Sequence, residues 1–324
     1  MQLRNASGLL CAALIAAAGG EALAQAGYPA RPVRIIVPSS AGGGTDIIAR
    51  IITPKLSERL GQQVVVDNRP GAGSIIGNEI AAKSPPDGYT LLMAISTIAI
   101  HPSSHKKLPY DALRDFAPVT QTVSAPNILV VHPSLPVKSV KELISLARAR
   151  PGQLNFGSAG SGTNPHLSME LFLSMAGLKM VHIPYKGSAP AIIDLLAGHV
   201  VVMTATMLTG IPHVRSGRLR ALGITGAKRS GAVPEIPTVA ETGLPGYEAV
   251  QWYGVLVPAQ TPRDMIARLH SELVAVLQSP DIKQKFLSDG ADPIGNTPEE
   301  FARFIRSETD KWAKVVRAAG IKPE

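Results

Sequence analysis

Apolar residues in this chain form short β-branched runs that alternate with longer stretches of helical spacing. The run Val33–Val37 ends at Pro38 and predicts a buried strand. Apolar residues then recur every three or four positions from Ile47 to Leu60, which predicts a helix that Gly61 stops. This part of the chain is therefore expected to form a strand, a loop and a helix.

Two more strands complete a β-α-β-α-β series. The runs Val64–Val66 and Thr90–Ala94 predict these strands. Between them, a glycine-rich loop at 68–77 leads into a helix that reaches Lys83. Alternation of this kind is typical of a parallel sheet with helices on both faces, so we expect an α/β fold.

The alternation restarts further along and predicts a second α/β unit. Its predicted strands are 128–131, 154–156, 181–184, 200–203 and 220–224. Its predicted helices are 139–150, 166–175 and 189–196. A Pro-rich stretch at 233–245 predicts a linker after this unit.

The C-terminal part predicts one strand and two helices with large apolar faces. Tyr253–Val257 reads as the strand, and the apolar positions from Met265 to Leu277 predict the first helix. A capping box at Thr297–Glu300 opens the last helix, which Gly320 closes. We expect the apolar faces of these helices to pack in a core.

The length of 324 residues predicts two domains. The C-terminal helices need a partner for their apolar faces, and the stretch at 233–245 resembles a return crossover. We therefore expect discontinuous domains: residues 25–125 plus 248–324 form domain 1, and residues 126–247 form domain 2.

Residues 1–24 predict a secretory signal. Arg4 supplies the positive end, Leu9–Ala18 is the apolar segment, and small residues at the −3 and −1 positions put cleavage before Gln25. Cys11 does not follow a small residue, so we expect no lipid anchor. We expect the mature protein in the periplasm.

Composition narrows the classes of function. Cys11 is the only cysteine, which excludes a disulfide framework and a zinc cluster built on cysteines. The net charge of +8 permits a polyanion partner, but aromatic residues make up only 4% of the chain, too few for a stacking surface. We therefore expect no nucleic acid partner, and the charge also suits a small anionic ligand.

Two glycine-rich loops, Ser39–Asp46 and Gly157–Thr163, each follow a strand and precede a helix. Glycine lets the backbone approach a ligand closely, and the following helix offers unpaired N–H groups and the positive end of its dipole. Neither loop matches a nucleotide P-loop or a dinucleotide fingerprint. One such loop in each unit indicates a site for a small anion such as a carboxylate.

The chain carries no recognisable catalytic motif. It has neither a Gly-x-Ser-x-Gly elbow nor a His-Glu-x-x-His pair, and its histidines are scattered. His166 follows the second loop and is a candidate for a role at the site. Asp46 lies at a predicted helix start, where an acidic residue more often caps the helix or pairs with its dipole than acts as a base. An exported hydrolase or lyase that uses Asp46 or His166 stays an alternative.

An ordered set of motifs resembles the Bug family, the extracytoplasmic solute receptors of tripartite tricarboxylate transporters. The matching segments are Pro38–Asp46, Asp67–Gly73, Pro86–Leu92, Gly157–Thr163, Pro184–Pro190 and Trp252–Gly254. The resemblance extends from about Tyr28 to the C-terminus.

This resemblance implies a two-domain, periplasmic-binding-protein-like (type II) α/β fold with a ligand cleft between the domains. It implies a binding protein rather than an enzyme, with no cofactor and no metal. The ligand would be a small organic carboxylate, and the partners would be the membrane permease subunits of the transporter. We expect a monomer. A ligand-sensing partner of a receptor kinase stays an alternative, because the same closure serves both roles.

Carried onto this sequence, the resemblance and the two loops give the candidate ligand-binding residues. They are Ser39, Ser40, Ala41, Gly42, Gly43, Gly44, Asp46, Ser96, Ser158, Ala159, Gly160, Gly162, Thr163, His166, Tyr185, Lys186, Val201 and Thr204. Val201 and Thr204 stand where the family usually has Asp and Phe, near the variable end of the ligand. We therefore expect a carboxylate without a free amine.

Overall fold

A computed structural model describes residues 27–318, whose strands pair along one path in the order β2-β1-β3-β9-β4-β7-β5-β6. Two further strands, β8 and β10, pair with β4. The strands are β1 (Val33–Val37), β2 (Val64–Asn68), β3 (Thr90–Ile95), β4 (Phe116–Val131), β5 (Asn155–Ser158), β6 (Val181–Pro184), β7 (Val202–Thr206), β8 (Arg220–Ile224), β9 (Val250–Pro258) and β10 (Asp292–Pro293).

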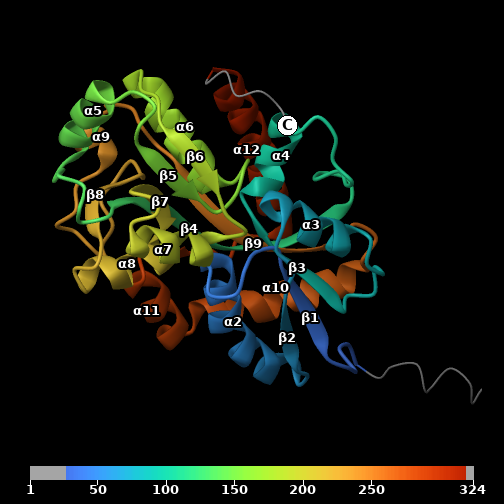
Figure 1. Ribbon diagram of the computed structural model, residues 1–324. Helices are drawn as coiled ribbons and strands as arrows, with labels where there is room; N and C mark the ends of the chain where they lie inside the picture. The colour runs from blue at the N-terminus through green and yellow to red at the C-terminus, as the bar shows by residue number, and fades with distance from the viewer. Residues whose placement is uncertain (1–26, 319–324) are drawn as a thin grey trace, which may run out of the picture.

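Helices surround both halves of this sheet. Figure 1 shows α5, α6, α7, α8 and α9 around one half, and α2, α3, α4, α10 and α12 around the other. The helices are α2 (Gly44–Leu60), η1 (Ala72–Ser74), α3 (Ile75–Ala82), α4 (Thr97–Ser104), α5 (Val140–Ala149), α6 (Asn164–Ala176), α7 (Ser188–Ala197), α8 (Met207–Arg215), α9 (Val239–Thr242), α10 (Arg263–Gln278), α11 (Pro280–Ser288) and α12 (Pro298–Ala318).

The sheet is mixed, whereas the alternation of elements predicts a parallel one. Strands β1, β2 and β3 pair in parallel, and so do β5, β6 and β7. Between these two groups, β4 and β9 run antiparallel to each other from Phe116↔Pro258 to Pro126↔Val250. The halves are thus joined by two long extended strands rather than by a further helical crossover, and this is why the parallel order breaks in the middle.

The hydrophobic core follows the two halves. One cluster joins residues between Val33 and Ala125 to residues between Tyr253 and Ala291. Two other clusters lie between Ile128 and Ala249. The C-terminal helices α10 and α11 therefore pack back onto the first half of the chain. The exact domain boundaries stay a prediction.

The Pro-rich stretch at 233–245 is a packed part of the second half and not a free linker. Val233, Ile236 and Val239 are each at most 7% exposed. A capping box between Thr238 and Glu241 opens the short helix α9. The expectation of a linker was wrong because the apolar residues between the prolines supply enough buried surface to fix the segment.

The sequence patterns gave no sign of the helices α4, α8 and α11 or of the first part of β4. Pro102 and Pro212 stand inside α4 and α8, where proline normally signals a break. The predicted signal at 1–24, its cleavage before Gln25, Cys11 and Gly320 lie outside the described residues. Within residues 27–318, no helix has both the length and the hydrophobicity needed to cross a membrane.

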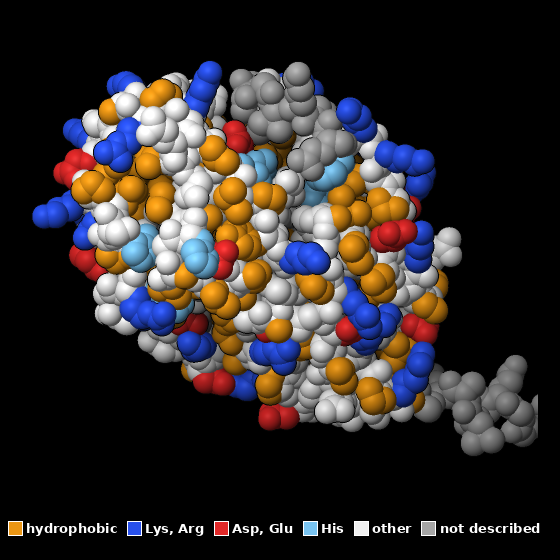
Figure 2. All heavy atoms as spheres, viewed as in Figure 1, with side chains coloured by type: hydrophobic (Ala, Val, Ile, Leu, Met, Phe, Trp, Pro, Cys, Tyr) orange, Lys and Arg blue, Asp and Glu red, His pale blue; other side chains and the backbone are white. Residues whose placement is uncertain are grey.

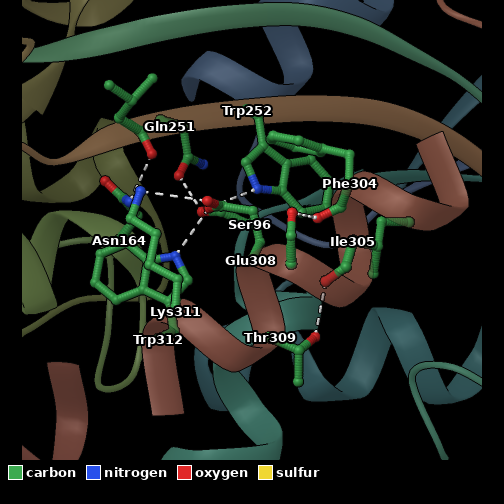
Figure 3. Close-up of polar contacts among 12 residues, drawn as sticks. Ser96, Asn164, Gln251, Trp252, Phe304, Ile305, Glu308, Thr309, Lys311 and Trp312 are labelled. Carbon is green, nitrogen blue, oxygen red and sulfur yellow. Dashed lines mark hydrogen bonds and ion pairs between the residues drawn. The ribbon is translucent and has the colours of Figure 1, made fainter. Parts of the chain in front are cut away.

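The last helix is fixed by a buried carboxylate as well as by its apolar face. The Trp252 and Trp312 indole nitrogens both donate to Glu308 Oε2, at 3.3 and 3.1 Å (Figure 3). Trp312 also packs with Ile100 and Leu167, so α12 contacts both halves of the chain. This contact places α12 beside the strand that carries Gln251 and Trp252.

Gly254 makes the close packing of α12 on β9 possible, which generates a first prediction. A Cβ at Gly254 would collide with the Phe301 ring, so Gly254→Ala should destabilise the protein by about 1–3 kcal/mol through overpacking. Urea denaturation measures this loss. Gly231→Ala is the matched control, because its Cβ would meet no atom within 4 Å. Equal stability of the two variants would contradict the packing argument.

Candidate functional site

A narrow cavity lies where loops from both halves of the sheet meet. Its lining comes from the loops after β1, β2, β5 and β6 and from the ends of β3, β7 and β9. The lining residues are Pro38, Ser39, Gly43, Gly44, Thr45, Gly71, Gly73, Ser74, Ile95, Ala159, Thr163, Pro165, Lys186, Gly187, Ser188, Thr206, Gln251 and Tyr253. Six of the predicted site residues line this cavity: Ser39, Gly43, Gly44, Ala159, Thr163 and Lys186.

The first predicted loop brings the start of helix α2 to the cavity. Gly43 is the N-cap residue in an extended conformation, and no side chain caps the helix. The first N–H groups of a helix have no partner within the helix, so those of Gly44 and Thr45 remain available at the cavity wall. The left-handed conformation in this loop belongs to Gly42, with φ of 74°, and not to Gly43.

Asp46 holds this loop in shape. Its carboxylate accepts hydrogen bonds from the Gly42 N–H at 2.8 Å, from Arg50 Nε and from Asn68 Nδ2. Burial alone would raise the pKa of Asp46, but the hydrogen bonds from Arg50, Gly42 and Asn68 outweigh it and hold the pKa below its ordinary value. The carboxylate therefore stays ionised, and its oxygens are already engaged in hydrogen bonds. This suits a structural role and not that of a base.

The second predicted loop presents the start of helix α6. Thr163 is the N-cap residue, but its hydroxyl donates to the Gly160 carbonyl at 2.6 Å instead of capping the helix. Ser158 Oγ lies 2.6 Å from His182 Nε2. These contacts fix the loop, while Ala159 and Thr163 face the cavity.

A third helix start lies at the same cavity. Gly187 is the N-cap of α7, again without a side-chain cap, and Ser188 in the first turn lines the cavity. The starts of α2 and α7 thus present unpaired N–H groups to one space. The start of α6 adds the positive end of its dipole only, because the Thr163 N–H donates to the Gly160 carbonyl and Pro165 has no N–H. Such a convergence favours an anion.

The cavity wall on β7 and β9 is polar but uncharged. Tyr253 is fully buried, and its hydroxyl lies beside the Gln251 side chain without a well-formed hydrogen bond, while Ser39 Oγ has no hydrogen-bond partner within the described residues. Burial raises the pKa of Tyr253 above its usual range, so the phenol stays protonated. A buried polar group normally has a partner, so both hydroxyls point to a bound molecule or water.

The loops on the two sides of the cavity touch at glycines. A Cβ at Gly73 would collide with the Ser161 carbonyl, and one at Gly187 would collide with Ser40 Oγ. Ser40 therefore contacts the opposite loop rather than lining the cavity. Only glycine permits such close approach of two backbones, so these contacts close the cavity from both sides.

Two predicted site residues, Ser158 and His166, lie behind the second loop. His166 Nδ1 accepts from the Gly162 N–H at 3.1 Å, and its ring stacks on His182 at 4.0 Å. Burial, with a smaller effect of His166, lowers the pKa of His182 to about 3. His182 is therefore uncharged near neutral pH, and the stacked pair supports the loop.

Other predicted site residues lie outside the lining. The Tyr185 hydroxyl donates to Asp194 at 2.7 Å, and the Thr204 hydroxyl donates to the Pro165 carbonyl at 2.6 Å. Val201, directly before β7, packs against the core of the second half. Ala41 and Gly42 are exposed, Ser96 lies directly behind Gln251, and Gly160 and Gly162 shape the second loop.

The lining contains residues that the sequence patterns did not select. Gly71, Gly73 and Ser74 come from the second glycine-rich loop of the first half, and Ser188 starts α7. Thr206, Gln251 and Tyr253 come from strand ends. Lys186, which is exposed, is the only charged side chain among the lining residues. Within residues 27–318, no group of three or more His, Cys, Asp or Glu side chains is arranged to hold a metal ion.

The mixed α/β sheet with a cavity between its halves is the fold of solved periplasmic binding proteins. The sequence model of the tripartite tricarboxylate transporter family receptor matches residues 48–321 of this chain. The chain belongs to this family.

Individual relatives agree with this assignment. Protein BugT of Bordetella pertussis is 42% identical over 297 residues, which cover 91% of each chain. The structure of R. palustris Rpa4515 with adipate is 39% identical, with a TM-score of 0.90 over 92% of this chain and 100% of the other. The periplasmic binding protein BugD is 31% identical, with a TM-score of 0.89 over 92% and 100% of the two chains.

The structural role of Asp46 generates a second prediction. Asp46→Asn should lower the free energy of unfolding at pH 7 by about 1–3 kcal/mol, since charge-assisted hydrogen bonds are lost. The folded-state pKa lies below the unfolded one, so this contribution is present above the unfolded pKa and is lost as the pH falls through the folded pKa.

Denaturation of wild type and variant at pH 7 and at progressively lower pH measures this dependence, and the difference between them should shrink in acid. Asp264→Asn is the control, because Asp264 is an exposed residue in the first turn of α10. A difference that grows in acid would contradict the assigned role.

Proposed function

We propose that this protein is a non-enzymatic periplasmic solute-binding protein. It captures a small organic carboxylate in the cavity and delivers it to the membrane permease of a tripartite tricarboxylate-type transporter. The observation that carries the proposal is the convergence of three uncapped helix starts, α2, α6 and α7, on one enclosed space. The structure of the relative with adipate supports a carboxylate as the ligand.

The ligand acts as the link between the two halves. Backbone N–H groups of Gly44 and Thr45 hold it from one side, and that of Ser188 at the start of α7 holds it from the other, where α6 adds the positive end of its dipole. A ligand that contacts both sides stabilises the closed arrangement over an open one. The closed form is then the one that the permease recognises. We propose that the protein does this as a monomer.

The absence of acidic side chains among the lining residues determines which carboxylates fit. An ammonium group in the cavity would have no carboxylate to pair with and would face the positive helix ends. We therefore propose a carboxylate without a free amine. The reason is the composition of the lining and not Val201 and Thr204, which lie outside it.

On the face drawn in Figure 2, the basic side chains are scattered among apolar, acidic and neutral ones and form no continuous stripe. On this face the positive charge is therefore dispersed instead of forming a track for a polyanion. This distribution supports a small anionic ligand as the partner of the net positive charge.

The proposal is tested by a thermal-shift screen of the purified mature protein against organic acids. A carboxylate at about 100 times its dissociation constant should stabilise the protein by about 2.7 kcal/mol, which raises the melting temperature by a few degrees. Aspartate and glutamate should give no shift at the same concentration. A screen in which no carboxylate shifts the melting temperature would reject the proposed function.

A variant at Gly44, which lines the cavity, tests where the ligand binds. A Cβ at Gly44 would lie 2.8 Å from Thr206 Oγ1 and 3.0 Å from the Tyr253 hydroxyl, so Gly44→Ala fills the cavity and displaces the carboxylate. The loss of a charge-assisted hydrogen bond lowers affinity by roughly ten- to a hundredfold. Calorimetric titration with the best ligand of the screen measures this loss. Gly231→Ala should bind as wild type does, and unchanged affinity of Gly44→Ala would place the site elsewhere.

Export generates a further prediction. The mature protein should begin at Gln25 and carry no lipid, because the predicted signal ends in a small-residue cleavage site. Intact-mass measurement of the protein recovered from the periplasm tests both points. A diacylglycerol adduct, or a mass that includes residues 1–24, would contradict them.

A further inference from the structure

Gly162, in the second predicted loop, lies between histidines from both halves of the chain. On its own half, His166 Nδ1 accepts from the Gly162 N–H, which requires that this nitrogen carry no proton. From the other half, α4 brings two imidazoles against it: a Cβ at Gly162 would be 2.9 Å from His105 Cε1 and 3.6 Å from His101 Cδ2. Helix α4 lies beside α12 in the first half (Figure 1). The loop that lines the cavity from the second half therefore rests on imidazole rings of the first half.

His101 is completely enclosed at this contact. Its side chain is 0% exposed, and its Nδ1 lies 2.9 Å from the Tyr110 hydroxyl. Its Nε2 lies beside Gly73 without a well-formed hydrogen bond. The Ser161 carbonyl of the second loop packs on the same glycine, since a Cβ at Gly73 would collide with that oxygen. The cover over His101 thus consists of one loop from each half.

Within the described residues, no element around His101 offers it a counter-ion. Strand β3, η1 and residues 159–163 contain no ionisable side chain. The carboxylates that α12, α6 and α3 hold on their sides facing other groups are paired elsewhere: Glu308 with Lys311, Glu170 with His166, and Glu79 with Lys83.

The remaining ionisable neighbours of His101 are neutral or positive. The ring centroid of His105 is 4.8 Å away, and Lys106 and Lys107 follow on the exposed turn after α4. Burial raises the pKa of Tyr110 above its usual range, so this phenol stays protonated and adds no negative charge. A proton added to His101 would place a positive charge in a dry space with nothing to balance it.

We propose that His101 is a positioning residue that lets the second loop close over the ligand only while its ring is uncharged, so that acid opens the cavity and weakens binding. This inference rests on the proposed function and adds a form of regulation to it. His101 does not line the cavity and acts through the loop that carries Gly162.

The sign of the effect follows from the two arrangements of the loops. Burial, with a smaller effect of His105, lowers the pKa of His101 to about 3, although the Gly73 carbonyl acts in the opposite direction. When the second loop leaves, water reaches the ring and its pKa returns toward the ordinary value of about 6.5. Closure is therefore favoured above this open-form value, and the contribution is lost as the pH falls through about 6.5 toward the closed-form value.

Two uncharged replacements test the role of His101. His101→Asn keeps a polar group for Tyr110, and His101→Phe keeps a ring under the loop. Calorimetric titration with adipate at pH 7.5, 6.5 and 5.5 gives the dissociation constants. One such histidine weakens binding about tenfold between pH 7.5 and 5.5, so the wild type should lose about tenfold more affinity over this range than either variant.

The comparison isolates His101 from other sources of pH dependence. Adipate and His166 take up protons in the same way in every protein, so their effects cancel between wild type and variants. His132→Asn is the matched control and should follow the wild-type profile, because His132 lies after β4, bonded to Ser134 and away from both loops. A merely structural defect would weaken binding equally at every pH. Circular dichroism shows whether each variant is folded.

A count of protons provides a second measurement that needs no variant. Titration with adipate at pH 6.5 in buffers of different ionisation heat gives the number of protons released on binding. The wild type should release about half a proton from His101 at this pH. If neither His101 variant folds, this count decides: no proton release rejects the inference.

The outcomes separate this inference from the proposed function. If adipate binds but the wild type and the His101 variants share one pH profile, the role of His101 is rejected and the proposed function stands. A His132→Asn variant that flattens the profile as much as the His101 variants also rejects it. If adipate does not bind the wild type at pH 7.5, the inference is rejected, and the broader acid screen decides the proposed function.

Discussion

The antiparallel pairing of β4 with β9 is the constraint on which the rest of this structure depends. These two strands run through both halves of the sheet, from Phe116↔Pro258 to Pro126↔Val250. They bring the loops after β1 and β5 to the same space, although the loops are more than a hundred residues apart. β9 also carries Gln251 and Tyr253 into the wall of the cavity, so a strand that joins the halves also shapes the site.

The sequence predicts well what depends on local pattern. The buried strand β1, helix α2 and both glycine-rich loops follow from apolar periodicity and glycine placement. The pairing of strands that are distant in the chain leaves a weaker pattern in the sequence. The first part of β4 is rich in threonine and glutamine and is interrupted by Pro118, so its composition hides a strand that is buried between partners. Thr120 Oγ1 donates to the Asn296 carbonyl and the Gln121 N–H donates to Asn296 Oδ1, so these two contacts form only once a distant part of the chain has folded back.

The loops of the candidate site could be predicted from the sequence, but the strand residues that form the cavity wall could not. A strand–glycine–helix sequence is a local signal, whereas Thr206, Gln251 and Tyr253 look like ordinary strand residues until β7 and β9 are placed beside the loops. Asp46 and His166, the two candidates for a catalytic role, have structural roles instead. Each accepts a backbone N–H from its own loop, Gly42 and Gly162 respectively, and so holds the glycines in place. A titratable residue beside a glycine-rich loop is therefore a weak sign of catalysis.

Under the proposed function, a receptor that must release its ligand gains from a site made mainly of dipoles, in which the exposed Lys186 is the only charged lining side chain. Each helix start contributes about 0.3–1 kcal/mol toward an anion, and each hydrogen bond to a charged group about 1.5–3 kcal/mol. These terms act together only while loops from both halves surround the ligand. When the loops separate at the Gly73–Ser161 and Gly187–Ser40 contacts, one set of donors is lost at once. Affinity then falls by the sum of several small terms, whereas a buried counter-charge would keep holding the ligand after opening. In the proposed function, a cavity without a buried counter-charge therefore couples closure to capture and opening to release.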